Sequence, residues 1–261
     1  TFIDFIHQTP FYGRVFLCLD DEHVKSIIPK ISRQVITYGL DRNALIQAKK
    51  LEHHENKMSF VVEDKAYKFK SFKVTINLPG EHYVRNALAA IGIALEYGLS
   101  ITDIKKGLKN FSGVGRRYEI FNNCFQQQKK FILVDDYGHH PTEIKAVLEA
   151  TRKGYPNKTI NLVFQPHRFT RTRDCFNDFI KALKMPDKLF LLDIYPAGER
   201  PIKNISTQSM IKAIANKKTF YLPDLRSAKK IILSEIKNDS IVILMGAGSI
   251  GNFAQQFTGN S

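Results

Sequence analysis

Apolar and polar positions follow a regular alternation in the second half of the chain, from about residue 118 onward. Short apolar runs predict strands, at about Tyr118–Asn122, Phe131–Asp135, Thr159–Phe164, Lys188–Leu192, Thr219–Tyr221 and Ile241–Met245. Amphipathic stretches between them predict helices, at about Thr142–Lys153, Thr170–Lys184, Ser206–Ala215, Leu225–Ile236 and Ile250–Phe257. Strands that alternate with helices indicate an α/β domain with a Rossmann-like, mostly parallel sheet that helices cover on both faces.

The first half has a less regular pattern, which predicts a mixed sheet with helices. Helices are expected at Phe2–Ile6, from the Asp20–Asp21 cap to about Ile28, within Leu78–Gly98 and at Ile101–Asn110. Strands are expected at Arg14–Leu19 and Val35–Tyr38, with three antiparallel strands at Lys57–Val62, Lys65–Lys70 and Phe72–Leu78. The break Phe111-Ser112-Gly113 is the best candidate linker, so we expect two domains, residues 1–112 and 113–261.

Composition narrows the class of protein. At 261 residues and 43% hydrophobic, the chain can bury a large core. It has no apolar run of transmembrane length and no signal peptide, and its three cysteines argue against a disulfide framework, so we expect a cytoplasmic protein without a membrane partner. The net charge of +14 fits a lysine-rich surface, a polyanionic nucleotide ligand or a nucleic acid. The lysines are spread along the chain, so charge alone does not decide among these three interpretations.

The segment VDDYGHHPTE, residues 134–143, holds the densest candidate chemistry. Asp135 and Asp136 end an apolar run, and Pro141 is typical of a first helical turn. The cluster therefore lies at the carboxyl end of a strand, which is where open α/β sheets bind ligands. The plainer interpretation is a helix-capping aspartate beside solvated loop histidines.

A second polar cluster, QPHRFTRTR, follows the next predicted strand. His167 and Arg168 come at the strand end, and Arg171 and Arg173 at the start of the following helix. Basic residues are usually unfavourable at a helix N-terminus, so their presence suggests an anion site. Alternatively, they are basic residues on a solvated helix face.

Three further motifs carry weaker signals. Arg116 and Arg117 follow the linker, where a guanidinium could close over a phosphate, although adjacent arginines are also common on strand surfaces. His82 and Asn86 start a helix and could read an adenine edge or merely cap that helix. GAGSIG, residues 246–251, fits a dinucleotide motif but lacks the acidic residue expected about twenty positions later, so NAD is rejected and close strand–helix packing is favoured.

Together, VDDYGHHPTE and FQPHRFTRTRD, with GVGRRYE, DIYPAGERPI and MGAGSIG, resemble the C-terminal part of the Mur ligase family. The resemblance covers essentially all 261 residues. It implies the remainder of a central ATPase domain followed by an amino-acid-binding domain of an ATP-dependent carboxylate–amine ligase of peptidoglycan synthesis, with links to cell-wall biogenesis, cell shape and division. It favours the branch that joins L-alanine to UDP-N-acetylmuramate through an acyl phosphate. The branch that recycles a tripeptide onto this sugar nucleotide is the nearer alternative, and a basic nucleic-acid-binding module is a rival from another class.

The resemblance also implies roles for particular residues. The catalytic set is Arg168, His167 and Arg171, which would bind the reacting carboxylate and the incoming alanine. Tyr137 and His139 would face the sugar-nucleotide and amino-acid side. The residues expected on the ATP side are Asn86, His82, Arg116, Arg117, Asp135 and Asp136. Tyr83 replaces an asparagine of the family pattern, which puts adenine recognition at that position in doubt.

The sequence also lacks parts that the family carries. There is no G-x-x-x-x-G-K-[ST] phosphate loop, and the chain opens in mid-pattern at Thr1. We therefore expect a C-terminal portion without the UDP-binding domain, with the Mg²⁺ ligands upstream, no metal ligand of its own, and no ligase activity alone.

Overall fold

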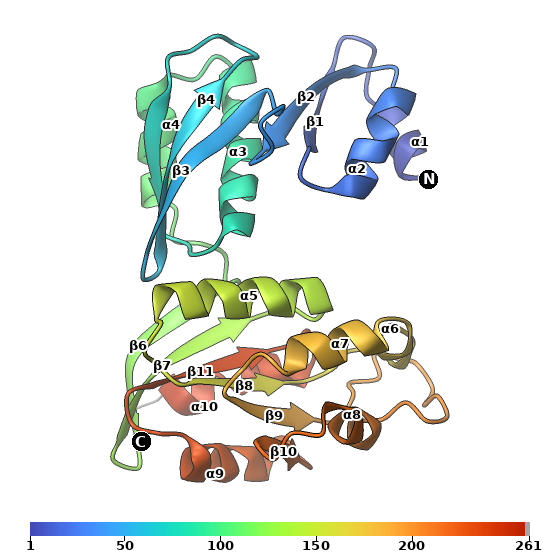
Figure 1. Ribbon diagram of the computed structural model, residues 1–261, viewed down its shortest axis with the longest axis vertical. Helices are drawn as coiled ribbons and strands as arrows, with labels where there is room; N and C mark the ends of the chain where they lie inside the picture. Colours follow the sequence, from blue (N-terminus) through green and yellow to red (C-terminus); the bar gives the residue numbers. More distant parts are fainter. Residues whose placement is uncertain (259–261) are drawn as a thin grey trace. The chain divides into compact units, whose positions relative to one another are not determined.

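The computed structural model describes residues 1–258, and its internal contacts divide the chain into two compact units, Thr1–Ser112 and Gly113–Ser261 (Figure 1). Each unit has its own sheet and its own helices, so each is described by itself. None of the helices in residues 1–258 is long and apolar enough to cross a membrane.

The first unit is built on a five-stranded sheet in the order β1-β2-β3-β4-β5. The first three strands are parallel and the last two are antiparallel additions, at β1 Arg14–Cys18, β2 Gln34–Gly39, β3 Ile46–His54, β4 Lys57–Asp64 and β5 Phe72–Ile76. Its helical segments are α1 Phe2–His7, α2 Glu22–Ile27, the 3-10 turn η1 Ile28–Lys30, α3 Glu81–Glu96 and α4 Ile101–Asn110. The apolar face of α3, including Val84, Leu88 and Ile91, is fully buried in this unit's core with residues of β3, β4 and β5.

Two sequence predictions in this unit are wrong. Residues 65–70 do not form a strand, because the Asp64 carboxylate accepts hydrogen bonds from the N–H groups of Ala66, Tyr67 and Phe69 and folds the segment into a turn. The strand beside β4 is instead β3, which the prediction missed, and it joins all five strands in one sheet.

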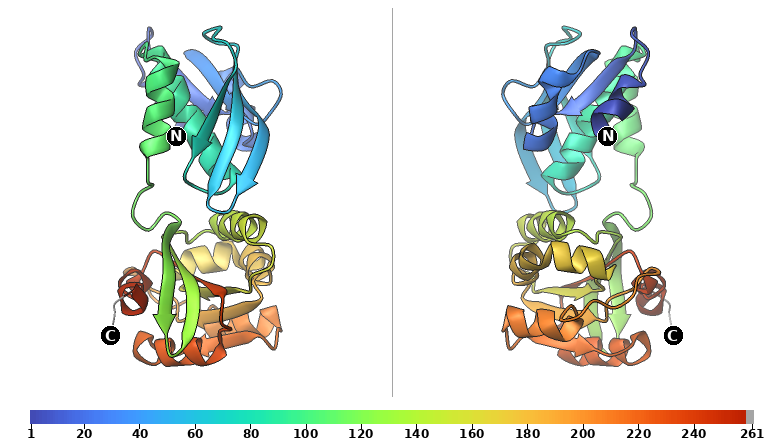
Figure 2. Two further views of the ribbon diagram at one scale, coloured as in Figure 1. Left: turned by 90° about the vertical axis from the view of Figure 1, so that its left-hand side faces the viewer. Right: turned by 90° about the vertical axis from the view of Figure 1, so that its right-hand side faces the viewer.

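The second unit carries a six-stranded sheet in the order β10-β9-β8-β11-β7-β6. All pairings are parallel except β6 with β7, which form the edge hairpin seen in Figure 2. The strands are β6 Glu119–Gln126, β7 Lys129–Asp136, β8 Ile160–Phe164, β9 Lys188–Leu192, β10 Thr219–Leu222 and β11 Ser240–Met245. Every residue of β8 and β11 is buried, which explains why these strands appear in the sequence as continuous apolar runs.

Helices cover both faces of this sheet, as predicted. One face packs against α9 Leu225–Glu235, the 3-10 turn η2 Ser249–Asn252 and α10 Gln255–Thr258. On the opposite side lie α5 Pro141–Gly154 and α7 Phe176–Leu183 (Figure 1), where the rings of Phe164 and Phe179 pack 5.8 Å apart. The remaining helices are α6 Phe169–Asp174 and α8 Thr207–Ile214. The predicted helix 170–184 is therefore interrupted at Cys175, and the last predicted helix is split into η2 and α10.

Candidate active site

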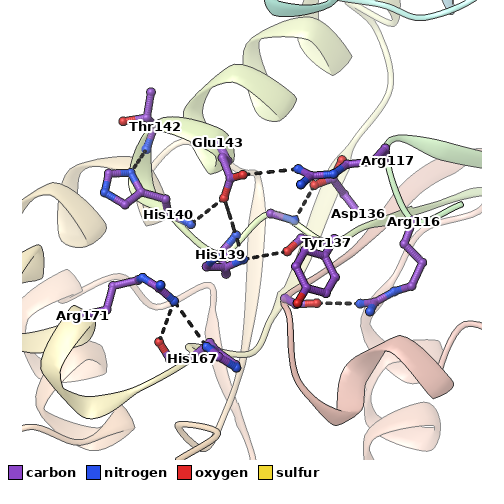
Figure 3. Close-up of polar contacts among 12 residues, drawn as sticks. Arg116, Arg117, Asp136, Tyr137, His139, His140, Thr142, Glu143, His167 and Arg171 are labelled. Atoms are coloured by element: carbon purple, nitrogen blue, oxygen red, sulfur yellow. Dashed lines mark hydrogen bonds and ion pairs between the residues drawn. The ribbon is translucent and has the colours of Figure 1, made fainter. Parts of the chain in front are cut away.

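The two polar clusters meet at one edge of the second sheet. Strands β7, β8, β9 and β11 are parallel, so their carboxyl ends lie together. The loops that follow them begin at Tyr137, Gln165, Asp193 and Gly246. This arrangement brings Tyr137, His139, His167 and Arg171 into one region, which Figure 3 shows in close-up.

Glu143 organises the loop between β7 and α5. Its Oε2 accepts hydrogen bonds from the backbone N–H groups of His139, at 2.8 Å, and His140, at 3.0 Å. Its Oε1 lies 3.3 Å from Nη1 of Arg117, so one carboxylate joins this loop to the segment after the linker (Figure 3). Burial acts to raise the pKa of Glu143, but these hydrogen bonds and the nearby cations outweigh it and lower that pKa. His140 is the N-cap residue of α5, and Pro141 is its first helical residue.

Aromatic rings connect the loops after β7, β8 and β9. The ring of His139 lies 5.5 Å from that of Tyr137 and 5.6 Å from that of His167. The His167 ring stacks on Tyr195, with 5.5 Å between centroids and an interplanar angle of 12°. Backbone hydrogen bonds in both directions, Tyr195 N to Pro166 O and Arg168 N to Tyr195 O, hold the two loops together. Burial lowers the pKa of His167, and the charges of His139 and the nearby arginines lower it further, so this imidazole favours its neutral form.

The basic segment after β8 already has an internal counter-ion. Arg168 is the N-cap residue of α6 with φ +72°, and its Nη1 lies 4.0 Å from Oε1 of Glu199. The Glu199 carboxylate also accepts the N–H, at 2.9 Å, and the hydroxyl, at 2.6 Å, of Thr170. Arg171 directs its Nη1 to the carbonyl oxygen of His167 at 3.3 Å. The side chain of Arg168 remains 51% exposed, so it can reach an external anion as well.

The two adjacent aspartates at the end of β7 have different surroundings. Both are 3% exposed. Asp136 accepts the backbone N–H groups of Tyr118, at 2.8 Å, and Gly138, at 2.7 Å. Asp135 faces Arg116, with 3.3 Å between its Oδ2 and the arginine Nε. Burial raises the pKa of both carboxyls, to about 6 for Asp135, where the charge of Arg116 partly offsets the effect of burial.

The two arginines after the linker also differ. The Arg116 guanidinium is directed inward, to Asp135 and to the carbonyl oxygen of Gly246 at 2.6 Å, and its side chain is 27% exposed. The Arg117 side chain is 46% exposed and pairs with Glu143. Both guanidinium groups lie over the ring of Tyr137, at 5.1 Å and 5.6 Å from its centroid.

The remaining predicted site residues, His82 and Asn86, belong to the first unit. Both lie near the N-terminus of α3, where Asn86 is exposed. The N-cap position of α3 is Gly80, which has no side chain to cap the helix. Between them, Arg85 donates to the Asp20 carboxylate at 2.6 Å, and this carboxylate also accepts the N–H groups of Leu40 and Asp41. The interaction connects α3 to the ends of β1 and β2.

Within residues 1–258, no three His, Cys, Asp or Glu side chains gather in a way that could hold a metal. Beside the aromatic rings, Gln165 hydrogen-bonds to the Ser249 side chain and the N–H of Ile250. It borders a cavity of about 670 Å³, lined by Gln165, Leu192, Asp193, Pro223, Asp224, Leu225, Arg226, Ser227 and Ser249.

Sequence reasoning missed three residues that hold this region together: Glu143, Tyr195 and Glu199. Glu143 stands three residues after His140, which is the spacing of a capping box, and that signal could have identified it. Tyr195 and Glu199 lie within the DIYPAGERPI motif, but their contacts with the segment after β8 depend on the pairing of that loop with its neighbour. Local sequence does not contain that information.

Two protein-family models match the chain, one in each unit. Residues 1–94 match the Mur ligase middle domain, and residues 116–248 match the family described as Mur ligase, glutamate ligase domain. The chain belongs to the Mur ligase family.

Individual relatives give a finer comparison. The chain is 43% identical over 260 residues to the UDP-N-acetylmuramate–L-alanine ligase of Hydrogenovibrio crunogenus, covering 98% of this chain and 56% of that protein. It is 46% identical over 255 residues to the enzyme of the same name from Neisseria meningitidis, covering 95% and 54%. The chain thus spans about half the length of these curated relatives.

Solved structures agree with this fold. The crystal structure of UDP-N-acetylmuramate-alanine ligase from Thermotoga maritima matches with a TM-score of 0.72 at 22% identity, covering 98% of this chain and 60% of that one. MurF from Acinetobacter baumannii matches with a TM-score of 0.76 at 16% identity, covering 98% and 54%. At this level of identity the likeness shows a shared fold.

Proposed function

We propose that this chain supplies the acceptor half of an ATP-dependent ligase that joins L-alanine to the lactyl carboxylate of UDP-N-acetylmuramate, in the cytoplasmic synthesis of peptidoglycan precursors. The observation that carries the proposal is the cluster of Tyr137, His139, His167, Arg168 and Arg171 at the carboxyl edge of the second sheet. The identity of 43–46% to ligases of that name supports the choice of substrates.

In this proposal the basic groups of the cluster stabilise negative charge during two successive chemical steps. A lactyl carboxylate oxygen would attack the terminal phosphorus of ATP and release ADP. The alanine nitrogen would then attack the acyl carbon, and phosphate would leave as the amide forms and the amine loses its proton. Arg168 and Arg171 are suited to stabilise the negative charge on the carboxylate and on the tetrahedral oxygen. His167 favours its neutral form, so it could accept the proton that the amine loses.

Each unit contains candidate ATP-contacting groups. Arg117 has the more exposed guanidinium of its pair and is the better candidate to reach a phosphate group. Asn86 is exposed at the start of α3 and could read the adenine edge, with His82 beside it. The sequence contains no phosphate-binding loop, so we expect no ADP release from the 261-residue chain alone.

A chimaeric enzyme tests the proposed function. Residues 1–261 would replace the matched segment of the Neisseria meningitidis relative, which supplies the rest of the enzyme. We expect ADP release that requires both UDP-N-acetylmuramate and L-alanine, at a rate within about tenfold of the unmodified relative. A chimaera that folds, by circular dichroism, but turns over only with the tripeptide would assign the chain to the recycling branch. A folded chimaera that is inactive with both acceptors would refute the proposal.

A further inference from the structure

The glycine turn, Gly246–Gly251, has no role in the function proposed above. Its sequence GAGSIG follows β11, as in a dinucleotide-binding motif. Such a motif binds a pyrophosphate at the N-terminus of a long helix. Here the end of the turn forms part of the four-residue 3-10 segment η2, and no long helix starts at this turn among the described residues.

An internal arginine occupies the space beside these glycines. The Nη2 atom of Arg116 donates to the carbonyl oxygen of Gly246 at 2.6 Å. A Cβ atom added to Gly251 would lie 2.4 Å from the guanidinium carbon of Arg116 and 2.5 Å from its Nη1. These separations are too short for a Cβ atom while the guanidinium stays in this position, so a side chain at position 251 would displace it.

The same arginine is bound through its backbone to the loop after β7. Arg116 has φ +58°, a strained value for a residue with a side chain. Its N–H donates to Glu119 Oε2 at 2.9 Å, and its carbonyl oxygen accepts the N–H of Tyr137 at 2.7 Å. Its guanidinium also lies over the Tyr137 ring and pairs with Asp135. Arg116 therefore joins the segment after the linker, the end of β7 and the glycine turn.

We propose that Arg116 is a positioning residue, whose guanidinium is received by the glycine turn and which thereby holds Tyr137 at the edge of the candidate active site. The role of Tyr137 in substrate binding rests on the proposed function. The competing assignment is that Arg116 contacts ATP directly, as the sequence resemblance implied. Its inward contacts and lower exposure, 27% against 46% for Arg117, favour the positioning role.

A double-mutant cycle in the 261-residue chain tests the structural part. We would measure hydrogen exchange of the Tyr137 amide by NMR in the wild type, Arg116→Ala, Gly251→Ala and the double variant. If the methyl group at position 251 acts by displacing the guanidinium, each single variant exchanges about tenfold faster, and the double variant exchanges no faster than Arg116→Ala.

Gly115→Ala provides the matched control, because a Cβ at Gly115 would meet only Glu119 Oε2, at an ordinary 3.8 Å. It should leave the exchange rate within about twofold of wild type. If Gly251→Ala behaves like Gly115→Ala, or if the two single effects multiply in the double variant, the positioning claim is wrong. Should Arg116→Ala unfold, the same cycle with Arg116→Lys replaces it, because lysine lacks the planar fork that makes these contacts.

Kinetics in the chimaera separate positioning from direct ATP binding. Arg116→Ala and Gly251→Ala should both lower kcat/KM for UDP-N-acetylmuramate by about 10- to 100-fold, as expected for a misplaced substrate-binding group. The KM for ATP should stay within about twofold of its original value. A tenfold rise in the KM for ATP would mean that Arg116 is an ATP ligand. If the chimaera is inactive before any substitution, the proposed function fails, and the exchange cycle still decides the positioning claim.

Discussion

Replacing Asp136 by Asn tests whether this buried carboxylate holds the start of the second unit in place. The carboxylate accepts the N–H groups of Tyr118 at 2.8 Å and Gly138 at 2.7 Å, and it is 3% exposed. Tyr118 has φ +53°, so the backbone there needs compensating contacts. An asparagine oxygen can accept one of the two N–H groups, while the asparagine NH2 group opposes the other.

The size of the expected loss in stability follows from these contacts. A hydrogen bond to a charged group contributes about 1.5–3 kcal/mol, and a buried donor without an acceptor costs about 1–3 kcal/mol. Burial raises the pKa of Asp136, so a neutral asparagine recovers part of the cost of burying a charge. We therefore expect a net loss of about 2 kcal/mol for Asp136→Asn, and about 3–4 kcal/mol for Asp136→Ala, which loses both acceptors.

Hydrogen exchange is the appropriate assay, because a chain with two units need not unfold in one step. A local loss of about 2 kcal/mol should accelerate exchange of the Tyr118 amide by roughly 30-fold. Asp178→Asn is the matched control, since Asp178 is 68% exposed and its one ion pair within residues 1–258 is a surface pair with Lys181. An Asp136→Asn rate within about threefold of the control would refute the reasoning, because it would mean that the carboxylate does not accept these two N–H hydrogen bonds in solution.

Three further predictions concern other contacts of the second unit. Glu143→Ala should accelerate exchange of the two histidine amides that it binds by at least about tenfold, whereas Glu149→Ala on the same helix should not. Burial raises the folded-state pKa of Asp135 to about 6, above its ordinary 3.8, so the folded state binds the proton first. As the pH falls from 7 to 4, the wild type should therefore gain up to about 3 kcal/mol over Asp135→Asn in the urea transition of the second unit. A pH-independent difference would contradict this. Lys129→Met should cost about 1–2 kcal/mol in the thermal transition of the second unit, because its ammonium group caps the carboxyl end of α9 at 2.6–2.9 Å. An unchanged Tm for that transition would show that water replaces this cap.

The sequence predicted best where burial alone determines the structure. Strands β8 and β11 are buried along their whole length, so their apolar runs identify them without further context. The predicted mostly parallel sheet is confirmed for the same reason. The sequence placed each polar cluster at the carboxyl end of its own strand, and the structure adds that His139 and His167 of these two loops are neighbours.

Where prediction failed, a local polar interaction or a distant partner decides the structure. Strand β3 was missed because Lys49 and Lys50 interrupt its alternation, and a bulge with Lys50 at φ +51° shifts its register. The false strand 65–70 is a turn organised by one Asp64 carboxylate. In the same way, the sequence could not show that Arg116 points inward while Arg117 is more exposed. The inward position of Arg116 depends on its hydrogen bond to the residue after β11, more than 120 residues away.

The central claim is that the basic segment after β8 binds the reacting groups. Arg168→Ala and Arg173→Ala in the chimaera test it directly, because the two side chains are 51% and 52% exposed and lie in the same segment. Arg173 pairs only with the neighbouring Asp174 among the described ion pairs. We predict that Arg168→Ala lowers alanine-dependent ADP release by about 100-fold, as for loss of a group that stabilises developing charge, while Arg173→Ala stays within about twofold. Equal rates for the two folded variants would contradict the claim, because the arginines would then be a solvated helix face and the acceptor site would lie elsewhere.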